Sequence, residues 1–255
     1  MSSDNREKEA PKPGRLPDPV ENRRHDAINP CGACPVRGLA VCGVLEPDEL
    51  RQLAELVHEI DYSKQQTVFL EGDDEGGLFI VTHGVAMIYK LLADGRRQVT
   101  GFLYPGDHFG IAIAGKHAYS VEAVTELSLC RFQRNQFEDL LERFPKLERR
   151  LLRESSNELV ANQEQMMLLG RKTAIEKVAS FLISLSRRRS VRPAADGRLW
   201  IPMRRSDIGD YLGLTTETTS RMLTQLKARG LIALGADHRV EILDHESLEI
   251  VAQGE

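Results

Sequence analysis

The sequence lacks several features that would assign it at once to a class of protein. No apolar run approaches the roughly 18–20 residues that span a bilayer, and residues 1–28 contain no apolar segment of the kind found in secretory signals. It contains no glycine-rich nucleotide loop with a P-loop lysine and no Ser/His/Asp or Cys/His catalytic pattern. The formal charge of −4 excludes a protein whose whole surface is basic and binds nucleic acid. These absences favour a cytoplasmic protein that is not an enzyme.

Positive charge is nevertheless concentrated in one block. Residues 171–230 hold 13 Lys and Arg against 5 Asp and Glu, a local charge of +8, whereas residues 1–170 and 231–255 are both acidic. A basic block of this kind inside an acidic chain is typical of a surface that binds a polyanion. A solvated helix face would carry the same charge, so charge alone does not decide between the two.

Composition divides the chain into four segments. Residues 1–29, rich in proline and charge, predict a disordered tail. Residues 30–136 predict an arm followed by a strand-rich domain, 137–170 a long helix, and 171–255 a basic C-terminal domain. Within the second segment, apolar spacing predicts a first helix over Leu45–Ile60.

The strand-rich part predicts a small antiparallel β-roll. Short runs rich in Val, Ile, Phe and Tyr are separated by glycine turns, a pattern typical of a roll or barrel. The runs are Thr67–Leu70, Leu78–Thr82, Val85–Leu91, Gln98–Leu103 and Ser128–Phe132.

A narrow apolar stripe predicts a long helix that begins at Pro145. Proline fits a first helical turn because its missing N–H would have no partner there. The stripe continues for about 25 residues, or roughly 37 Å at 1.5 Å per residue, which is longer than the surface of one small domain. It therefore predicts a seam with a second copy of the chain, in which a polar asparagine fixes the register. The seam residues are Leu151, Leu159, Asn162, Met166 and Leu169. The alternative is a connecting helix that packs on its own domain.

The basic block begins with the pattern of a helix-turn-helix. Thr173–Arg188 predicts an amphipathic helix. Ser206 is a candidate N-cap for a short helix that ends at Leu212. Gly213 then supplies the sharp turn that the motif requires.

A second helix and a hairpin complete this predicted domain. Thr215 or Thr216 caps a helix that Gly230 ends. Residues 231–243 predict a β-hairpin, the wing of a winged helix-turn-helix. A helix-turn-helix followed by a wing inside a +8 block predicts DNA binding.

Three side chains at the start of the second helix have the chemistry to read bases. Glu217, Ser220 and Arg221 stand at i, i+3 and i+4 and therefore share one outer face. Arg221 can fork onto guanine O6 and N7, Glu217 can accept from cytosine N4, and Ser220 can contact either class of base. The predicted contacts to DNA phosphates are Arg204, Arg205 and Thr216.

The four cysteines suggest a metal centre. Cys31, Cys34 and Cys42 form C-x2-C-x7-C, and Cys130 follows at the end of an expected strand. Thiolates hold zinc or iron–sulfur clusters. Structural zinc usually takes two separated pairs, so the arrangement of three plus one suits a [4Fe–4S] cluster better but leaves zinc open. Cys130 could also be a buried core thiol.

These features together resemble the fumarate-and-nitrate-reduction regulators (FNR) of the cyclic-AMP receptor protein superfamily. The resemblance rests on the cysteine pattern, the roll, the long helix and Asp207-Ile-Gly-x-Tyr-Leu-Gly-Leu-Thr-x-Glu217-Thr-x-Ser220-Arg221, and it covers roughly residues 30–252. The Glu-x-x-Ser-Arg element resembles the base-reading triplet of FNR, and the x7 gap resembles alphaproteobacterial relatives.

The resemblance implies an oxygen sensor with an α+β fold. Cys31, Cys34, Cys42 and Cys130 would ligate one [4Fe–4S] cluster that is intact without oxygen. The protein would then form a homodimer through the long helix, bind an inverted repeat close to TTGAT-N4-ATCAA, and act with RNA polymerase on anaerobic genes. Oxygen would convert the cluster and weaken the dimer.

Three other interpretations compete with this one. A cyclic-nucleotide-responsive regulator would need an Arg beside a hydroxyl residue in the segment 106–123, which offers only Lys116. A regulator that responds to zinc or redox state would use the same cysteines. An iron–sulfur or thiol enzyme would not explain the helix-turn-helix.

Overall fold

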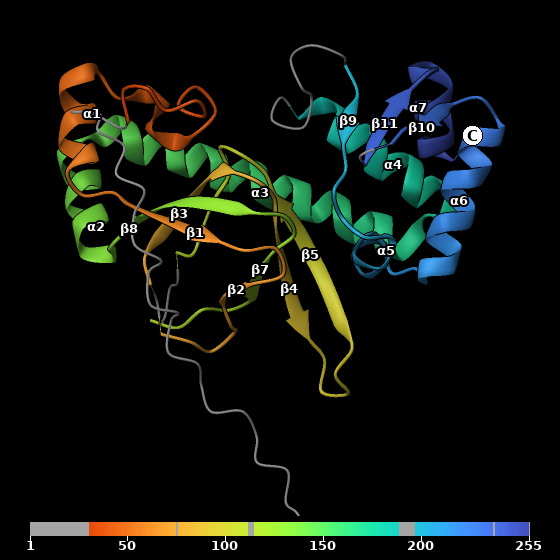
Figure 1. Ribbon diagram of the computed structural model, residues 1–255, viewed down its shortest axis with the longest axis horizontal. Coiled ribbons are helices and arrows are strands. Elements are labelled where there is room, and N and C mark those ends of the chain that lie inside the picture. Colours follow the sequence, from red (N-terminus) through yellow and green to blue (C-terminus); the bar gives the residue numbers. More distant parts are fainter. Residues whose placement is uncertain (1–30, 75, 112–114, 189–196, 237, 255) are drawn as a thin grey trace, which may run out of the picture.

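The computed structural model describes residues 31–74, 76–111, 115–188, 197–236 and 238–254. The tail expected over residues 1–29 lies outside them. The described chain forms an arm and β-roll, a long helix and a C-terminal helical domain, which confirms the expected α+β organisation (Figure 1). None of the helices in these ranges is long and apolar enough to cross a bilayer.

The arm precedes the roll and is partly helical. It contains a 3-10 turn, η1 (Val41–Val44), and one α-helix, α1 (Pro47–Ala54). The expectation of a helix over Leu45–Ile60 is wrong beyond Ala54. His58–Tyr62 instead form strand β1, because their backbone groups pair in antiparallel register with strand β8.

The roll consists of two four-stranded antiparallel sheets, with strand orders β1-β8-β3-β6 and β2-β7-β4-β5. Beyond β1, the bounds are β2 Thr67–Phe69, β3 Leu78–His83, β4 Ala86–Leu91, β5 Arg97–Leu103, β6 His108–Phe109, β7 Ser120–Ala123 and β8 Leu127–Phe132. Five strands match the expected apolar runs. An aromatic core lies between the sheets, where the ring centroids of Phe69 in β2 and Phe79 in β3 are 6.0 Å apart.

Two helices follow the roll, α2 (Arg134–Arg143) and α3 (Pro145–Arg171). Figure 1 shows α3 running across the molecule, from the end that carries α1 and α2 to the C-terminal helices. The helix expected from Pro145 is confirmed, and its 27 residues make it the longest element described.

The C-terminal domain contains four helices and a three-stranded sheet of order β10-β11-β9 in the described chain. The bounds are α4 Ala174–Arg187, β9 Leu199–Trp200, α5 Arg205–Leu212, α6 Thr216–Ala228, β10 Ile232–Leu234, β11 Arg239–Ile242 and α7 His245–Gln253. The expected helix-turn-helix and wing are confirmed. β9 and α7 are additions that the apolar pattern did not indicate.

One apolar core joins the roll to this domain. Met87, Phe102 and Tyr104 from the β4–β5 sheet are buried in the same cluster as Phe181 of α4 and Ile208 of α5. The ring centroids of Phe102 and Phe181 are 6.3 Å apart. The helix-turn-helix is therefore packed on the β2-β7-β4-β5 sheet of its own chain.

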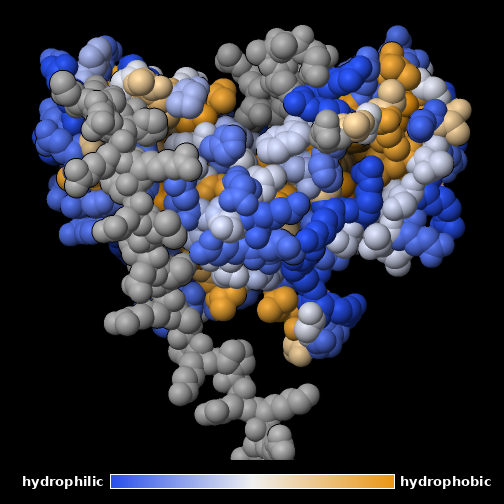
Figure 2. Space-filling model, viewed as in Figure 1, coloured by the Kyte–Doolittle hydropathy of each residue, from blue (hydrophilic) through white to orange (hydrophobic). Residues whose placement is uncertain are grey.

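The end of the β4–β5 hairpin projects away from this core. Leu91 and Leu92 are about half exposed there. Figure 2 shows hydrophobic residues beside hydrophilic ones at the lower end of the molecule, where Figure 1 places the hairpin. A second group of hydrophobic residues lies at the upper right of this face, over the C-terminal domain, and hydrophilic residues cover most of the area between the two.

Candidate DNA interface and cysteine centre

The first helix of the helix-turn-helix begins two residues earlier than its sequence suggests. Arg204 is the N-cap of α5, and its backbone N–H donates to the Asp207 carboxylate at 3.0 Å. The assignment of Ser206 as N-cap is wrong, because Ser206 lies within the first turn. An acid in that turn also suits the positive end of the helix dipole.

Two glycines allow α5 and α6 to approach each other. Gly213 ends α5 with φ 63°, a left-handed conformation that glycine adopts at little cost. Gly209 lies inside α5, and a Cβ added there would stand 2.7 Å from the Leu214 carbonyl oxygen and 3.3 Å from Thr219 Oγ1. Gly209 was not among the residues expected to matter, although a glycine inside a predicted helix is a signal of close packing.

The second helix, α6, starts and ends as expected. Thr215 is its N-cap, and Thr215 Oγ1 accepts a hydrogen bond from the Thr218 backbone N–H at 3.1 Å. Gly230, after the last turn, has φ 73°. Leu223 and Leu226 are buried on the inner face of the helix, which fixes the opposite face toward solvent.

The three proposed base-reading side chains lie on that outer face. Glu217 and Arg221 are exposed and Ser220 is half-buried. Thr216, the first residue of α6, is also exposed. The face therefore presents a guanidinium, a carboxylate and two hydroxyl groups at the end of the helix that enters a major groove in this motif.

The two arginines at the start of α5 differ in their surroundings. Arg204 is exposed, whereas Arg205 is half-buried, and burial lowers the pKa of the Arg205 guanidinium. Arginine stays charged under such shifts. Arg204 is accordingly the freer of the two to meet a phosphate.

The four cysteines gather where the arm meets the roll and the long helix. Cys31 and Cys42 are buried in one apolar cluster with Leu147 of α3, and Cys130 packs against that cluster from strand β8. Cys34 is half-buried. All four thiols are free of disulfide bonds.

The thiols are close enough to influence one another. Burial, and then the charges of Cys42 and Cys34, raise the pKa of Cys31 to about 12. Burial, and then Cys34, raise the pKa of Cys42 to about 11. The pKa of Cys130 is raised by burial first, and then by Cys31 and Cys34. Without a metal the buried thiols are protonated at neutral pH, so ligation must release protons.

The donor set fits an iron–sulfur cluster. In the ranges described, no three His, Cys, Asp or Glu side chains converge on one point as they would around a single metal ion. A [4Fe–4S] cluster presents a separate iron to each of four thiolates, so its ligands do not need to meet at one point. Four gathered thiols in an apolar setting fit that group.

The long helix α3 leaves an apolar face exposed. Its exposed large side chains are Leu152, Leu159, Val160, Met166 and Met167, between 55% and 69% exposed. Of the residues expected in a dimer seam, Leu159, Asn162 and Met166 lie in the solvent-exposed part of α3. Leu151 and Leu169 are half-buried against clusters of their own chain.

Comparisons with known proteins agree with this architecture. Residues 59–144 match the model of the cyclic nucleotide-binding domain, and residues 176–250 match the Crp-like helix-turn-helix domain. The chain is 39% identical over 222 residues to the nitrogen fixation regulation protein FixK of Bradyrhizobium diazoefficiens, a match that covers 87% of this chain and 93% of that protein. The chain belongs to the CRP/FNR family of transcription regulators.

Other members of the CRP/FNR family show the same similarity. The chain is 38% identical to the transcriptional activator protein FnrL of Cereibacter sphaeroides, with 87% of this chain and 91% of FnrL covered. It is 32% identical to the transcriptional activator protein anr of Pseudomonas aeruginosa, with 88% and 93% covered.

A solved structure of a CRP/FNR protein has the same fold. The structure of FixK2 from Bradyrhizobium japonicum matches with a TM-score of 0.71 and 35% identity over 76% of this chain and 96% of that chain. The chain is therefore a DNA-binding transcription regulator and not an enzyme, and it binds DNA through its helix-turn-helix.

Proposed function

We propose that this CRP/FNR protein is an oxygen-responsive regulator that holds a [4Fe–4S] cluster on Cys31, Cys34, Cys42 and Cys130. The observation that carries the proposal is the gathering of these four thiols at the junction of the arm, β8 and α3. Such a cluster, when bound, would be the part of the protein that reacts with oxygen. The relatives named FnrL and anr are described as transcriptional activators, which agrees with control of genes through RNA polymerase.

The segment that carries the arm thiols is in direct contact with the long helix. Cys42 lies in η1, and η1 packs directly on α3. Leu147 is fully buried and Leu151 half-buried in the cluster that contains Cys31 and Cys42. A ligated arm is cross-linked to β8 through Cys130 and is therefore held against the N-terminal half of α3. Ordering of the arm thus stabilises one position of this helix.

The exposed face of α3 would pair with a second copy. Leu152, Leu159 and Met166 recur every seven residues, the spacing of a coiled-coil seam, and all three are more than half exposed in the single chain. To move the protein from about 1% to about 99% active dimer, the ligated state must favour that form by about 5.5 kcal/mol.

The dimer would read an inverted repeat close to TTGAT-N4-ATCAA. Two α6 helices related by a two-fold axis enter successive major grooves about 34 Å apart. Arg221 would fork onto a guanine in each half-site, Glu217 would accept from a cytosine, and Ser220 would lie near a thymine. Arg204, Arg205 and Thr216 would contact phosphates.

Anaerobic isolation tests this function. The protein purified without air should show visible absorbance, about four iron and four sulfide per chain, and binding to the inverted repeat, and all three should be lost in air. The Cys130→Ser protein should lose the cluster and DNA binding, because it lacks the proposed ligand that lies outside the arm. Stoichiometric zinc without sulfide, or a Cys130→Ser protein with four irons and full DNA binding, would contradict the proposal.

A further inference from the structure

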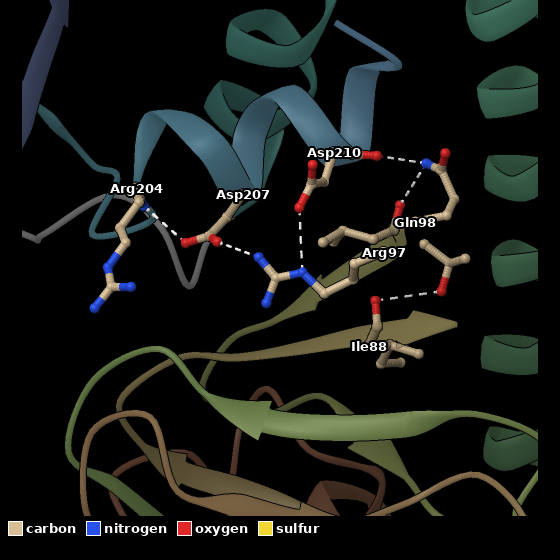
Figure 3. A network of polar contacts seen from close by, with 8 residues as sticks. Ile88, Arg97, Gln98, Arg204, Asp207 and Asp210 are labelled. Atoms are coloured by element: carbon tan, nitrogen blue, oxygen red, sulfur yellow. Dashed lines mark hydrogen bonds and ion pairs between the residues drawn. The ribbon is translucent and has the colours of Figure 1, made fainter. Parts of the chain in front are cut away.

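The first helix of the helix-turn-helix is tied to the β2-β7-β4-β5 sheet by a fork of ion pairs. Arg97, at the start of β5, donates from Nη2 to Asp207 Oδ1 at 2.6 Å and from Nε to Asp210 Oδ2 at 3.1 Å (Figure 3). Gln98 donates from Nε2 to the Asp210 carbonyl oxygen at 2.5 Å. The side chains of Arg97 and Asp207 are only 24% and 7% exposed, so solvent screens this contact little.

The Arg97 contact is separate from the folding of α5. Asp207 uses its Oδ2 atom to cap the helix through the Arg204 backbone N–H, and its Oδ1 atom to accept from Arg97. Loss of Arg97 leaves the cap and its dipole contact in place. Arg97 therefore acts between domains.

The chain connection alone does not fix the position of the helix-turn-helix. Only Lys172 and Thr173 separate α3 from α4, and both are extended. Rotation about these two residues would swing α4, α5 and α6 together. The position is held instead by side-chain contacts. The shared apolar core packs the domain on the sheet, and polar contacts add direction: Arg97 and Gln98 hold α5 from the sheet, and Gln165 of α3 donates to the Tyr211 carbonyl oxygen at 2.9 Å.

We propose that Arg97 is a positioning residue that sets which half-site spacing the dimer accepts. In a two-fold dimer, the angle between each helix-turn-helix and α3 fixes the separation and rotation of the two α6 helices. A planar guanidinium that forks onto two carboxylates holds an angle better than a single flexible contact does. The proposed base-reading face of α6 stays exposed in this arrangement, so the contact of Arg97 with α5 is compatible with DNA binding. The inference rests on the proposed dimer and inverted repeat.

The neighbouring arginine provides a matched control. Arg96 pairs with Asp94 in the same hairpin, and its side chain is 77% exposed. Arg97→Gln and Arg96→Gln remove the same charge from adjacent positions. Only Arg97→Gln removes the contact with α5.

The test measures affinity for inverted repeats whose spacers run from three to six base pairs, with full-length protein prepared without air. Each added base pair turns one half-site by about a tenth of a turn, so a rigid dimer should discriminate strongly between spacers. Wild type and Arg96→Gln should prefer one spacer. Arg97→Gln should bind that spacer about tenfold more weakly, the factor that one hydrogen bond to a charged group contributes, and should discriminate less against the others.

A second variant keeps the test decisive if Arg97→Gln folds poorly. Asp210→Asn weakens one arm of the fork and leaves the Asp207 cap intact. It should also flatten the spacing preference, with thermal unfolding close to that of wild type. If Arg97→Gln, Asp210→Asn and Arg96→Gln all prefer the same spacer as strongly as one another, Arg97 does not set the half-site spacing. Failure of the wild-type dimer to bind any inverted repeat would instead overturn the proposed function.

Discussion

The residues proposed to read bases and those proposed to anchor phosphates lie at different places in the helix-turn-helix. Glu217 and Arg221 are exposed one helical turn apart on the outer face, whereas Arg204 stands at the start of the preceding helix. Contacts to base edges carry sequence information, and contacts to phosphates carry affinity that depends on salt. Substitutions at Arg221 and at Arg204 should therefore change DNA binding in different ways.

Arg221→Ala should cost about 1–3 kcal/mol per half-site and relax the preference for guanine, because the fork onto O6 and N7 is lost. Arg204→Ala should weaken binding to every sequence and flatten the dependence on salt. Binding titrations against the repeat and a guanine-substituted repeat, at several salt concentrations, measure both effects. If Arg221→Ala still separates the two sites as wild type does, Arg221 does not read the guanine.

Gly209 lies where α5 packs closely on the turn and on α6. A Cβ at this position meets the Leu214 carbonyl oxygen at 2.7 Å, and backbone cannot move aside as a flexible side chain can. Gly209→Ala should lower the free energy of unfolding by about 1–3 kcal/mol, the usual cost of overpacking a core. Chemical denaturation measures this change.

A second helical glycine provides the control for that measurement. Nothing lies within 4 Å of a Cβ added at Gly170 near the end of α3. Gly170→Ala should be neutral or raise stability by up to about 1 kcal/mol, as helix propensity predicts. A Gly209→Ala protein as stable as the Gly170→Ala protein would show that α5 and α6 can relax apart.

At the scale of elements, α3 should hold the dimer together. Leu159→Glu places two like charges in the proposed seam and should convert the anaerobic dimer to monomers, as sizing by light scattering would show. Leu159→Met keeps the volume and should leave the dimer intact. A stable dimer in the Leu159→Glu protein would place the interface elsewhere.

The elements themselves were predictable to different degrees. The helix from Pro145, the helix-turn-helix and the wing could be predicted because capping residues, glycines and apolar period agree locally. β1 could not, since His58–Tyr62 carry mostly exposed polar side chains and become a strand only by pairing with β8. The Arg97 fork joins residues 110 or more positions apart, and no local pattern encodes such a pair.

At the scale of the whole molecule, loss of the proposed cluster should make the arm more mobile. The turn that carries Cys42 has backbone hydrogen bonds from Gly43 N–H to the Ala40 carbonyl and from Leu45 N–H to the Cys42 carbonyl. Hydrogen exchange over residues 31–45 should rise after exposure to air, while strands β3 and β4 keep their protection. Unchanged exchange in the arm would show that its order does not depend on ligation.

The shared core of the roll and the C-terminal domain also limits how this chain can change in evolution. Met87, Phe102 and Tyr104 are buried in one core with residues of α4 and α5. A roll joined to a helix-turn-helix domain taken from another relative would expose these aromatic and aliphatic side chains unless the partner surface matched. A change of DNA sequence preference should therefore be reached more readily through substitutions on the outer face of α6 than through exchange of the whole domain.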